Sequence, residues 1–260
     1  MTQRERRVYL IKALLAEEPQ YEGCAIPQDE IGQQRLLRSL MNVRPPRPIG
    51  GDFLAVQDAY LRQRAEEKGI VTLAELTPVE DKLYIWQGDI SRLAVDAIVN
   101  AANSGMTGCY CPCHGCIDNA IHTFAGLQLR LECAELMGRQ GHEEPTGGAK
   151  LTKAYNLSSK YVLHTVGPIV SGALSHRDEE LLEDCYRSCL KLAEKSGISS
   201  VAFCCISTGE FHFPNRRAAE IAVQTVKDFL RDNQSEMKVI FNVFRDEDYR
   251  IYKELLPAAK

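Results

Sequence analysis

Hydrophobic side chains recur every three or four residues through the first part of the chain. Such pairs occur in three separate stretches: Ile11 and Leu14, Leu37 and Leu40, and Phe53 and Val56. This spacing places apolar side chains on one face of a helix, so it predicts three amphipathic helices between residues 4 and 69. The proline-rich segment 44–51 separates the second helix from the third, and Gly69 after Lys68 is typical of a helix end.

From about residue 81 the pattern changes to short apolar runs that alternate with amphipathic stretches. A run such as 201–206, apolar at successive positions, indicates a strand covered on both faces by helices. The predicted strands are 83–86, 96–100, 151–156, 161–166, 201–206 and 239–244, and the predicted helices are 117–125, 178–195, 215–231 and 246–255. This alternation predicts a three-layer α/β fold with a mostly parallel or mixed sheet, preceded by a small helical extension.

Composition narrows the classes of function. The chain has 260 residues, 45% of them hydrophobic, with a net charge of -4 and a sequence pI near 5.9. These values are ordinary for a water-soluble globular protein and argue against a strongly basic nucleic-acid binder. The apolar run 8–12 is too short for a signal peptide, and no stretch is long enough to span a membrane. We therefore expect a cytoplasmic protein with reduced thiols.

The densest chemistry lies in one short loop, which contains Cys109, Cys111, Cys113, His114 and Cys116. Thiolates and an imidazole at this density are typical ligands of a tetrahedral zinc ion. Disulfides between such closely spaced cysteines would be strained, and a cytoplasmic setting disfavours them. An iron–sulfur cluster is a further alternative. The remaining cysteines lie in apolar stretches, where packing explains them.

Three predicted strands lead into loops that suit a nucleotide. Asp89 could accept a hydrogen bond from an exocyclic amine, although an aspartate there also caps turns. Asn100 and Asn103 could bind sugar hydroxyls, although an Asn-rich turn is the simpler explanation. The loop 207–211 could bind a pyrophosphate through backbone N–H groups, or be an ordinary strand-to-helix turn. Ligands of α/β sheets bind at the carboxyl ends of strands, so we expect the three loops to converge.

Taken together, these motifs resemble the macrodomain family, which binds ADP-ribose. The matching segments are G-D-I at 88–90, N-A-A-N at 100–103, C-I-D-N-A-I-H-T-F-A-G at 116–126, G-G-A at 147–149, H-T-V-G-P at 164–168 and S-T-G-E-F-H-F-P at 207–214. With its cysteine and histidine loop, the chain is more narrowly similar to zinc-containing macrodomains, which are bacterial and fungal protein-ADP-ribose hydrolases. The resemblance implies an α/β/α macrodomain with a mixed central sheet at residues 76–260 and a helical N-terminal extension at 1–75.

The resemblance also implies a binding role for each motif. Asp89 would accept the adenine amine, Ile90 would line the base pocket and Asn103 would bind the distal ribose. The diphosphate would lie between the start of the helix at 117–125 and the loop that follows the strand 201–206. The residues implied there are Ile117, Asp118 and Asn119 from the helix, and Ser207, Thr208, Gly209, Glu210 and Phe211 from the loop.

Catalytic and metal-binding roles follow from the same resemblance. Asp118 aligns with the acidic position near the scissile bond, and with Asn103 it forms the implied catalytic pair. The implied zinc ligands are Cys109, His114 and Cys116. Three protein ligands would leave the fourth position to water or substrate. The chain also departs from the pattern, because Cys111 and Cys113 are additional thiols that could compete for the metal or close the site, and His212 replaces a common glycine.

The function that the resemblance implies is zinc-dependent removal of mono-ADP-ribose from Asp or Glu side chains of a protein. Its partners would be ADP-ribose and mono-ADP-ribosylated protein, with neither a membrane nor a nucleic acid. In the resembled subgroup the substrate can be a lipoyl-carrier protein modified by a sirtuin-type ADP-ribosyltransferase. Two alternatives remain open: a non-catalytic module that reads ADP-ribose and carries a structural zinc, and a zinc-stabilised domain that binds nucleic acid or protein, against which the acidic charge argues.

Overall fold

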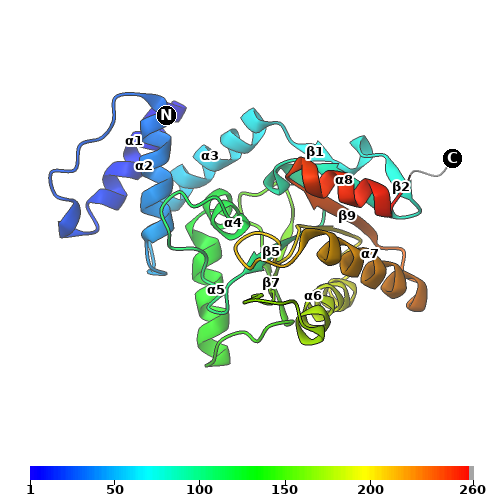
Figure 1. Cartoon of the computed structure of the whole chain (residues 1–260). Coiled ribbons are helices and arrows are strands. Elements are labelled where there is room, and N and C mark those ends of the chain that lie inside the picture. Colours follow the sequence, from blue (N-terminus) through cyan, green and yellow to red (C-terminus); the bar gives the residue numbers. More distant parts are fainter. Residues whose placement is uncertain (258–260) are drawn as a thin grey trace.

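Three helices precede the sheet in the computed structural model, which describes residues 1–257 (Figure 1). They are α1 (Gln3–Leu15), α2 (Glu30–Val43) and α3 (Gly51–Lys68). Side chains of Thr2 and Asp29 cap the first two helices, because each accepts a hydrogen bond from a backbone N–H of the first turn. Gly69, with φ of 81°, ends α3. The three predicted helices are therefore confirmed.

These helices form a hydrophobic cluster of their own, here called the extension core. Leu10, Leu37 and Phe53 are buried in it, one from each helix. A further member, Leu127, comes from α5 of the α/β unit. The extension therefore packs against the rest of the molecule through shared apolar contact. None of the helices within residues 1–257 is long and apolar enough to cross a membrane.

A seven-stranded mixed sheet forms the centre of the α/β unit. Its strand order is β2-β3-β9-β8-β5-β7-β6, in which the five inner strands are parallel and the edge strands β2 and β6 are antiparallel to their neighbours. The strands are β2 (Pro78–Glu80), β3 (Leu83–Gln87), β5 (Ala97–Ala102), β6 (Ala149–Lys153), β7 (Tyr161–Val166), β8 (Ser200–Phe203) and β9 (Lys238–Val243). Two short strands pair in parallel outside this sheet: β1 (Val71–Thr72), which follows α3, and β4 (Leu93–Ala94), which precedes β5.

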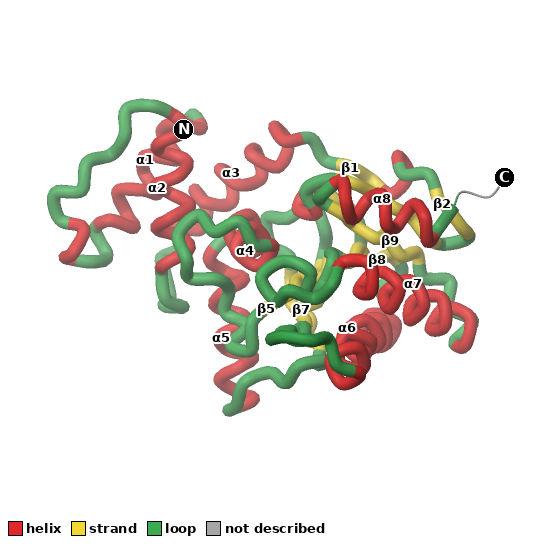
Figure 2. Tube along the Cα trace, viewed as in Figure 1, coloured by secondary structure: helices red, strands yellow, loops and turns green. Residues whose placement is uncertain are grey.

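Helices cover both faces of the sheet, which confirms the three-layer α/β/α architecture with its helical N-terminal extension (Figures 1 and 2). The helices are α4 (Ile117–Ala125), α5 (Leu127–Gln140), α6 (His176–Lys195), α7 (Asn215–Asp232) and α8 (Asp246–Leu255). Paired residues Phe203 and Phe241 stack on tyrosines of α6 and α8, with ring centroids 4.9 and 5.1 Å apart. Asn100 of β5, on the opposite face, contacts α4.

The sequence pattern misses α5 and the short strands β1, β2 and β4, and it places three strand ends too late. The strand predicted at 151–156 ends at Lys153, and Tyr155 takes a positive φ of 54° that extended backbone does not allow. In α5 the buried face includes Arg130 and Cys133 beside two leucines. A charged residue within the buried stripe hides the apolar period on which the prediction depends.

Candidate functional site

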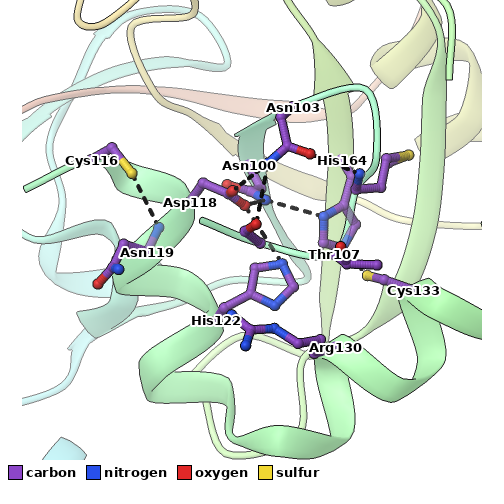
Figure 3. Close-up of polar contacts among 12 residues, drawn as sticks. Asn100, Asn103, Thr107, Cys116, Asp118, Asn119, His122, Arg130, Cys133 and His164 are labelled. Atoms are coloured by element: carbon purple, nitrogen blue, oxygen red, sulfur yellow. Dashed lines mark hydrogen bonds and ion pairs between the residues drawn. The ribbon is translucent and has the colours of Figure 1, made fainter. Parts of the chain in front are cut away.

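Three sequence-predicted loops leave the sheet at one edge. They follow β3, β5 and β8, which run parallel, so their carboxyl ends share a side of the molecule. The expected convergence of the loops at Asp89, Asn103 and Ser207 is thus a consequence of the strand topology. Helix α4 begins beside the middle loop and brings Asp118 to it (Figure 3).

Asp118 is a buried carboxyl in the first turn of α4, with only 4% of its surface exposed. Asn100 Nδ2 donates to its Oδ1 over 2.8 Å, and Asn103 Nδ2 lies 3.4 Å from its Oδ2. Burial raises the pKa of Asp118 to about 6, although the hydrogen bond from Asn100 and the charge of Arg130 act in the opposite direction. The two residues of the implied catalytic pair, Asp118 and Asn103, therefore lie side by side.

The backbone around Asn103 holds its side chain beside Asp118. Asn103 Oδ1 accepts a hydrogen bond from Met106 N over 3.1 Å, and Nδ2 donates to Gly108 O over 3.2 Å. Gly108 has φ of 89°, and a Cβ added there would lie 2.8 Å from the His122 ring. This position therefore requires glycine for both its conformation and its close approach.

Two buried histidines, His122 and His164, lie next to Asp118 on its interior side (Figure 3). His122 Nε2 is 3.5 Å from Asp118 Oδ1. His164 Nδ1 accepts a hydrogen bond from Asn100, and its Nε2 donates to Thr152 Oγ1 over 2.9 Å. Burial lowers the pKa of His164 to about 3. Both histidines are therefore neutral. His164 is joined to Asp118 through Asn100, whereas neither ring nitrogen of His122 has a hydrogen-bond partner within residues 1–257.

The side chains of His122, Cys133 and His164 come close enough to share a metal ion. Both nitrogens of His164 already have hydrogen-bond partners, and the charge of Arg130 helps to lower the pKa of His122. A nearby fixed cation and an engaged imidazole both disfavour a metal there. Packing of a neutral polar group explains this cluster.

The three implied zinc ligands come together in the loop before α4. The ligand atoms of Cys109, His114 and Cys116 all lie within 4.8 Å of one another, and Cys109 Sγ is 3.7 Å from His114 Nδ1. In tetrahedral zinc, with Zn–S near 2.3 Å and Zn–N near 2.1 Å, the sulfur and nitrogen atoms are about 3.6 Å apart. Two thiols and one imidazole at this separation fit a zinc ion.

The two additional thiols of the loop point elsewhere. Cys113 Sγ is 3.2 Å from Ser39 Oγ and donates to Arg35 O on α2. Cys111 is exposed, and its carbonyl oxygen accepts a hydrogen bond from Asn119 Nδ2 over 2.9 Å. Within residues 1–257, the ligand group assembled by this loop therefore has three members.

Asp89 both caps a turn and forms an ion pair. Its Oδ1 accepts hydrogen bonds from Ser91 N and Oγ, and its Oδ2 is 3.0 Å from Lys68 Nζ of α3. Burial raises its pKa, but the bonds from Ser91 and the charge of Lys68 outweigh this and hold the pKa below its usual value. Lys68 Nζ also lies 3.1 Å from the centre of the Phe124 ring. Ile90, beside Asp89, is buried in the core.

The loop after β8 folds back on itself. Ser207 has φ of 64°, its carbonyl accepts a hydrogen bond from Phe213 N, and Phe211 O accepts one from Val170 N. Glu210 Oε1 lies 3.6 Å from His114 Nε2, so this loop meets the cysteine and histidine loop. His212, which replaces the common glycine, adopts a glycine-like φ of 56° and is exposed.

Sequence reasoning misses the residues that the extension contributes to this region. Lys68 reaches Asp89 from α3, and Arg38 and Asn42 reach the cysteine and histidine loop from α2. None of these residues belongs to a motif, and their partners are far along the chain. In the sequence, Arg38 and Asn42 are only the polar neighbours of the buried Leu37 and Met41, and nothing indicates that they contact the loop.

This chain is similar to known proteins both in sequence and in fold. Residues 99–222 match the family model described as the Macro domain. A protein-ADP-ribose hydrolase of Treponema medium is 59% identical over 260 residues, which cover 98% of this chain and all of the relative. One of Staphylococcus aureus (strain COL) is 48% identical over 96% of this chain and 94% of the relative. The Trypanosoma brucei macrodomain crystallised with ADP-ribose has a TM-score of 0.66 and 30% identity, covering 84% and 94% of the two chains.

Proposed function

This chain belongs to the macrodomain family, and from that premise we propose that it is a protein-ADP-ribose hydrolase that releases mono-ADP-ribose from the carboxylate side chains of proteins. The relatives named as protein-ADP-ribose hydrolases match it over nearly its whole length, extension included. The preference for an Asp or Glu ester and the use of zinc are the finer parts of the proposal. We also propose that the protein acts in the cytoplasm.

One observation carries the proposal: the buried carboxyl of Asp118 lies two residues after Cys116, a member of the three-ligand group. Cys116 is also the N-cap of α4, because its Sγ accepts a hydrogen bond from Asn119 N over 3.4 Å. The helix start therefore fixes one potential metal ligand and the reactive carboxyl together. Positioning of this kind lowers the entropy cost of bringing reacting groups together.

In the proposed reaction, one water is consumed and the bond between the distal ribose and the carboxylate oxygen of the modified side chain breaks. Asp118 orients the water and accepts its proton, while Asn100 holds the carboxyl by its hydrogen bond to Oδ1. Asn103 binds the distal ribose next to that carboxyl. The substrate carboxylate leaves, and ADP-ribose is the other product.

Cys109, His114 and Cys116 would hold the zinc ion, which when bound supplies a Lewis acid beside the distal ribose. The rest of ADP-ribose would occupy the sheet edge. Asp89 would accept the adenine amine, with Ile90 beneath it. The N-terminal turn of α4 and the loop after β8 would bind the diphosphate between them, since free N–H groups at a helix start favour anions.

The test measures zinc content, ADP-ribose binding and release of ADP-ribose from a protein modified on Asp or Glu. We expect Asp118→Ala to bind ADP-ribose and zinc but to lose at least a hundredfold in turnover. His114→Ala and Cys109→Ser should lose zinc and turnover together. Cys111→Ser is the matched control, because Cys111 is exposed and outside the three-ligand group.

Three outcomes separate the components of the proposal. Full turnover in zinc-free protein would show that the metal takes no part in the mechanism. The Asp118→Ala variant would then still test the role of the carboxyl. ADP-ribose binding without hydrolysis of any ester would favour a module that only reads the modification. Turnover on another linkage and none on Asp or Glu esters would overturn the substrate class. A lipoyl-carrier protein modified by a sirtuin-type ADP-ribosyltransferase is the first protein substrate that we propose to try.

A further inference from the structure

The loop formed by residues 109–116, here called the ligand loop, runs between α2 and α4 (Figure 2). It has no regular secondary structure. One backbone hydrogen bond, from His114 N to Cys111 O, closes a turn within it. Cys113 has a positive φ of 53°, which costs energy for any residue other than glycine. Contacts from outside the loop must therefore hold this shape.

Arg38 of α2 supplies one group of these contacts. Its Nε and Nη2 donate to Asn119 Oδ1 over 3.0 and 2.6 Å, and Nη2 also donates to His114 O over 2.9 Å. Asn119 in turn donates from its backbone N to Cys116 Sγ and from Nδ2 to Cys111 O. One guanidinium therefore joins the backbone of His114 to the residue that contacts Cys116.

Asn42 and Ser39 of α2 supply a second group. Asn42 Oδ1 accepts a hydrogen bond from Cys113 N over 2.9 Å, and its Nδ2 donates to Thr123 Oγ1 of α4 over 2.9 Å. Asn42 is only 1% exposed, so these bonds are shielded from water. Ser39 Oγ contacts the thiol of Cys113. One face of α2 thus contacts the ligand loop at His114 and at Cys113.

We propose that α2 of the N-terminal extension is a built part of the metal site, and that Arg38 is the positioning residue that fixes the ligand loop in the shape that binds the ion. This inference rests on the zinc site of the proposed function. It assigns the extension a role that the α/β unit does not fill. Residues that orient metal ligands from outside the coordination sphere commonly change metal affinity by about 10–100-fold when they are replaced.

Arg38→Gln and Arg35→Gln form a matched pair of variants. Both remove one positive charge from α2, but the Arg35 side chain is exposed and makes no hydrogen bond or ion pair among those described for residues 1–257. We expect Arg38→Gln to weaken zinc binding at least tenfold in competition with a chromogenic chelator. Saturating zinc should restore most of its turnover. Arg35→Gln should match the wild-type protein, and Arg38→Lys should lie between the two.

Hydrogen exchange in zinc-free protein tests the same role without the metal. The backbone amides of Cys111 and of residues 113–116 should exchange at least tenfold faster in Arg38→Gln than in Arg35→Gln, while the amides of β5 and β7 keep their rates. If the two variants exchange alike and bind zinc alike, Arg38 does not position the loop. If wild-type protein binds no zinc at all, the metal part of the proposed function fails, and the exchange rates alone decide whether α2 holds the loop.

Discussion

Asp118 and His164 have pKa values displaced toward the neutral form by the same cause. Burial raises the pKa of the Asp118 carboxyl to about 6 and lowers the pKa of the His164 imidazole to about 3. Both side chains contact Asn100, whose amide donates to each. A carboxyl and an imidazole are therefore joined through one amide in an environment that disfavours charge on either.

The pKa of His164 predicts a pH dependence of stability. Because the folded value of about 3 lies below the ordinary value of 6.5, the unfolded chain binds a proton that the folded chain excludes. The contribution of His164 to stability is then fully present above pH 6.5 and is lost as the pH falls toward 3, by about 2 kcal/mol between pH 6.5 and 5. The raised pKa of Asp118 gives a contribution of opposite sign in this range, which is the same in any variant that leaves Asp118 unchanged. Urea unfolding at several pH values measures this slope.

His164→Gln is the comparison that isolates this histidine. Gln cannot take up the proton, so the variant should lose stability less steeply than wild type between pH 6.5 and 5, even if it is less stable at pH 7. Burial is the largest cause that lowers the pKa of His122, followed by the charges of His164 and Arg130, so most of the His122 contribution to the slope remains in the variant. Equal slopes would show that His164 titrates normally in the folded protein.

At the scale of elements, Arg130 links the end of α2 to the ligand loop. Its Nη1 donates to the carbonyl oxygens of Met41, Asn42 and Arg44 at the carboxyl end of α2. Its guanidinium carbon lies 4.4 Å from the centre of the Tyr110 ring. A cation that binds the last carbonyl groups of a helix stabilises that end.

Arg130→Met should therefore destabilise the protein by about 2–4 kcal/mol, because three buried carbonyl groups lose a charged donor. Urea unfolding measures this loss. Arg139→Met on the same helix is the control, since Arg139 is exposed and donates only to its own helix; it should change stability by less than about 0.5 kcal/mol. A loss of similar size in both variants would argue against the capping role.

The sequence predicts the helices and strands that pack through apolar side chains recurring at a regular spacing. The three extension helices and the inner strands of the sheet follow from such repeats, as does the alternation that gives three layers. The sequence also locates the ligand loop and the loops at Asp89 and Asn103. Arg38, Asn42 and Arg130 escape prediction because each acts through hydrogen bonds to residues more than 70 positions away, and no local periodicity encodes such a partner.

At the scale of the whole molecule, Leu127 joins the extension to the α/β unit. It belongs to α5 but is buried at 4% exposure in the extension core. Its backbone N also donates to Gln57 Oε1 of α3 over 3.0 Å. Gly126, with φ of 96°, leaves room for Gln57 at this junction, because a Cβ there would lie 2.6 Å from Gln57 Nε2.

Leu127→Ala should lower the free energy of unfolding by about 2–5 kcal/mol, the usual cost of such a truncation in a packed core. Hydrogen exchange should show faster opening of α1, α2 and α3, with little change in β5 and β8. Leu129→Ala is the comparison, because Leu129 is buried in the core of the α/β unit instead. Its effect should fall on the sheet, and identical exchange patterns in both variants would mean that the two cores open together.

The ligand loop lies between two helices, α2 from early in the chain and α4, which follows the loop directly. Helix α2 is complete before Cys109 leaves the ribosome, whereas α4 follows the loop immediately. Ser39 and Asn42 of α2 are therefore synthesised before Cys113, the loop residue that they contact. If the ion binds as proposed, it enters a loop whose backbone Arg38 and Asn42 already hold through hydrogen bonds.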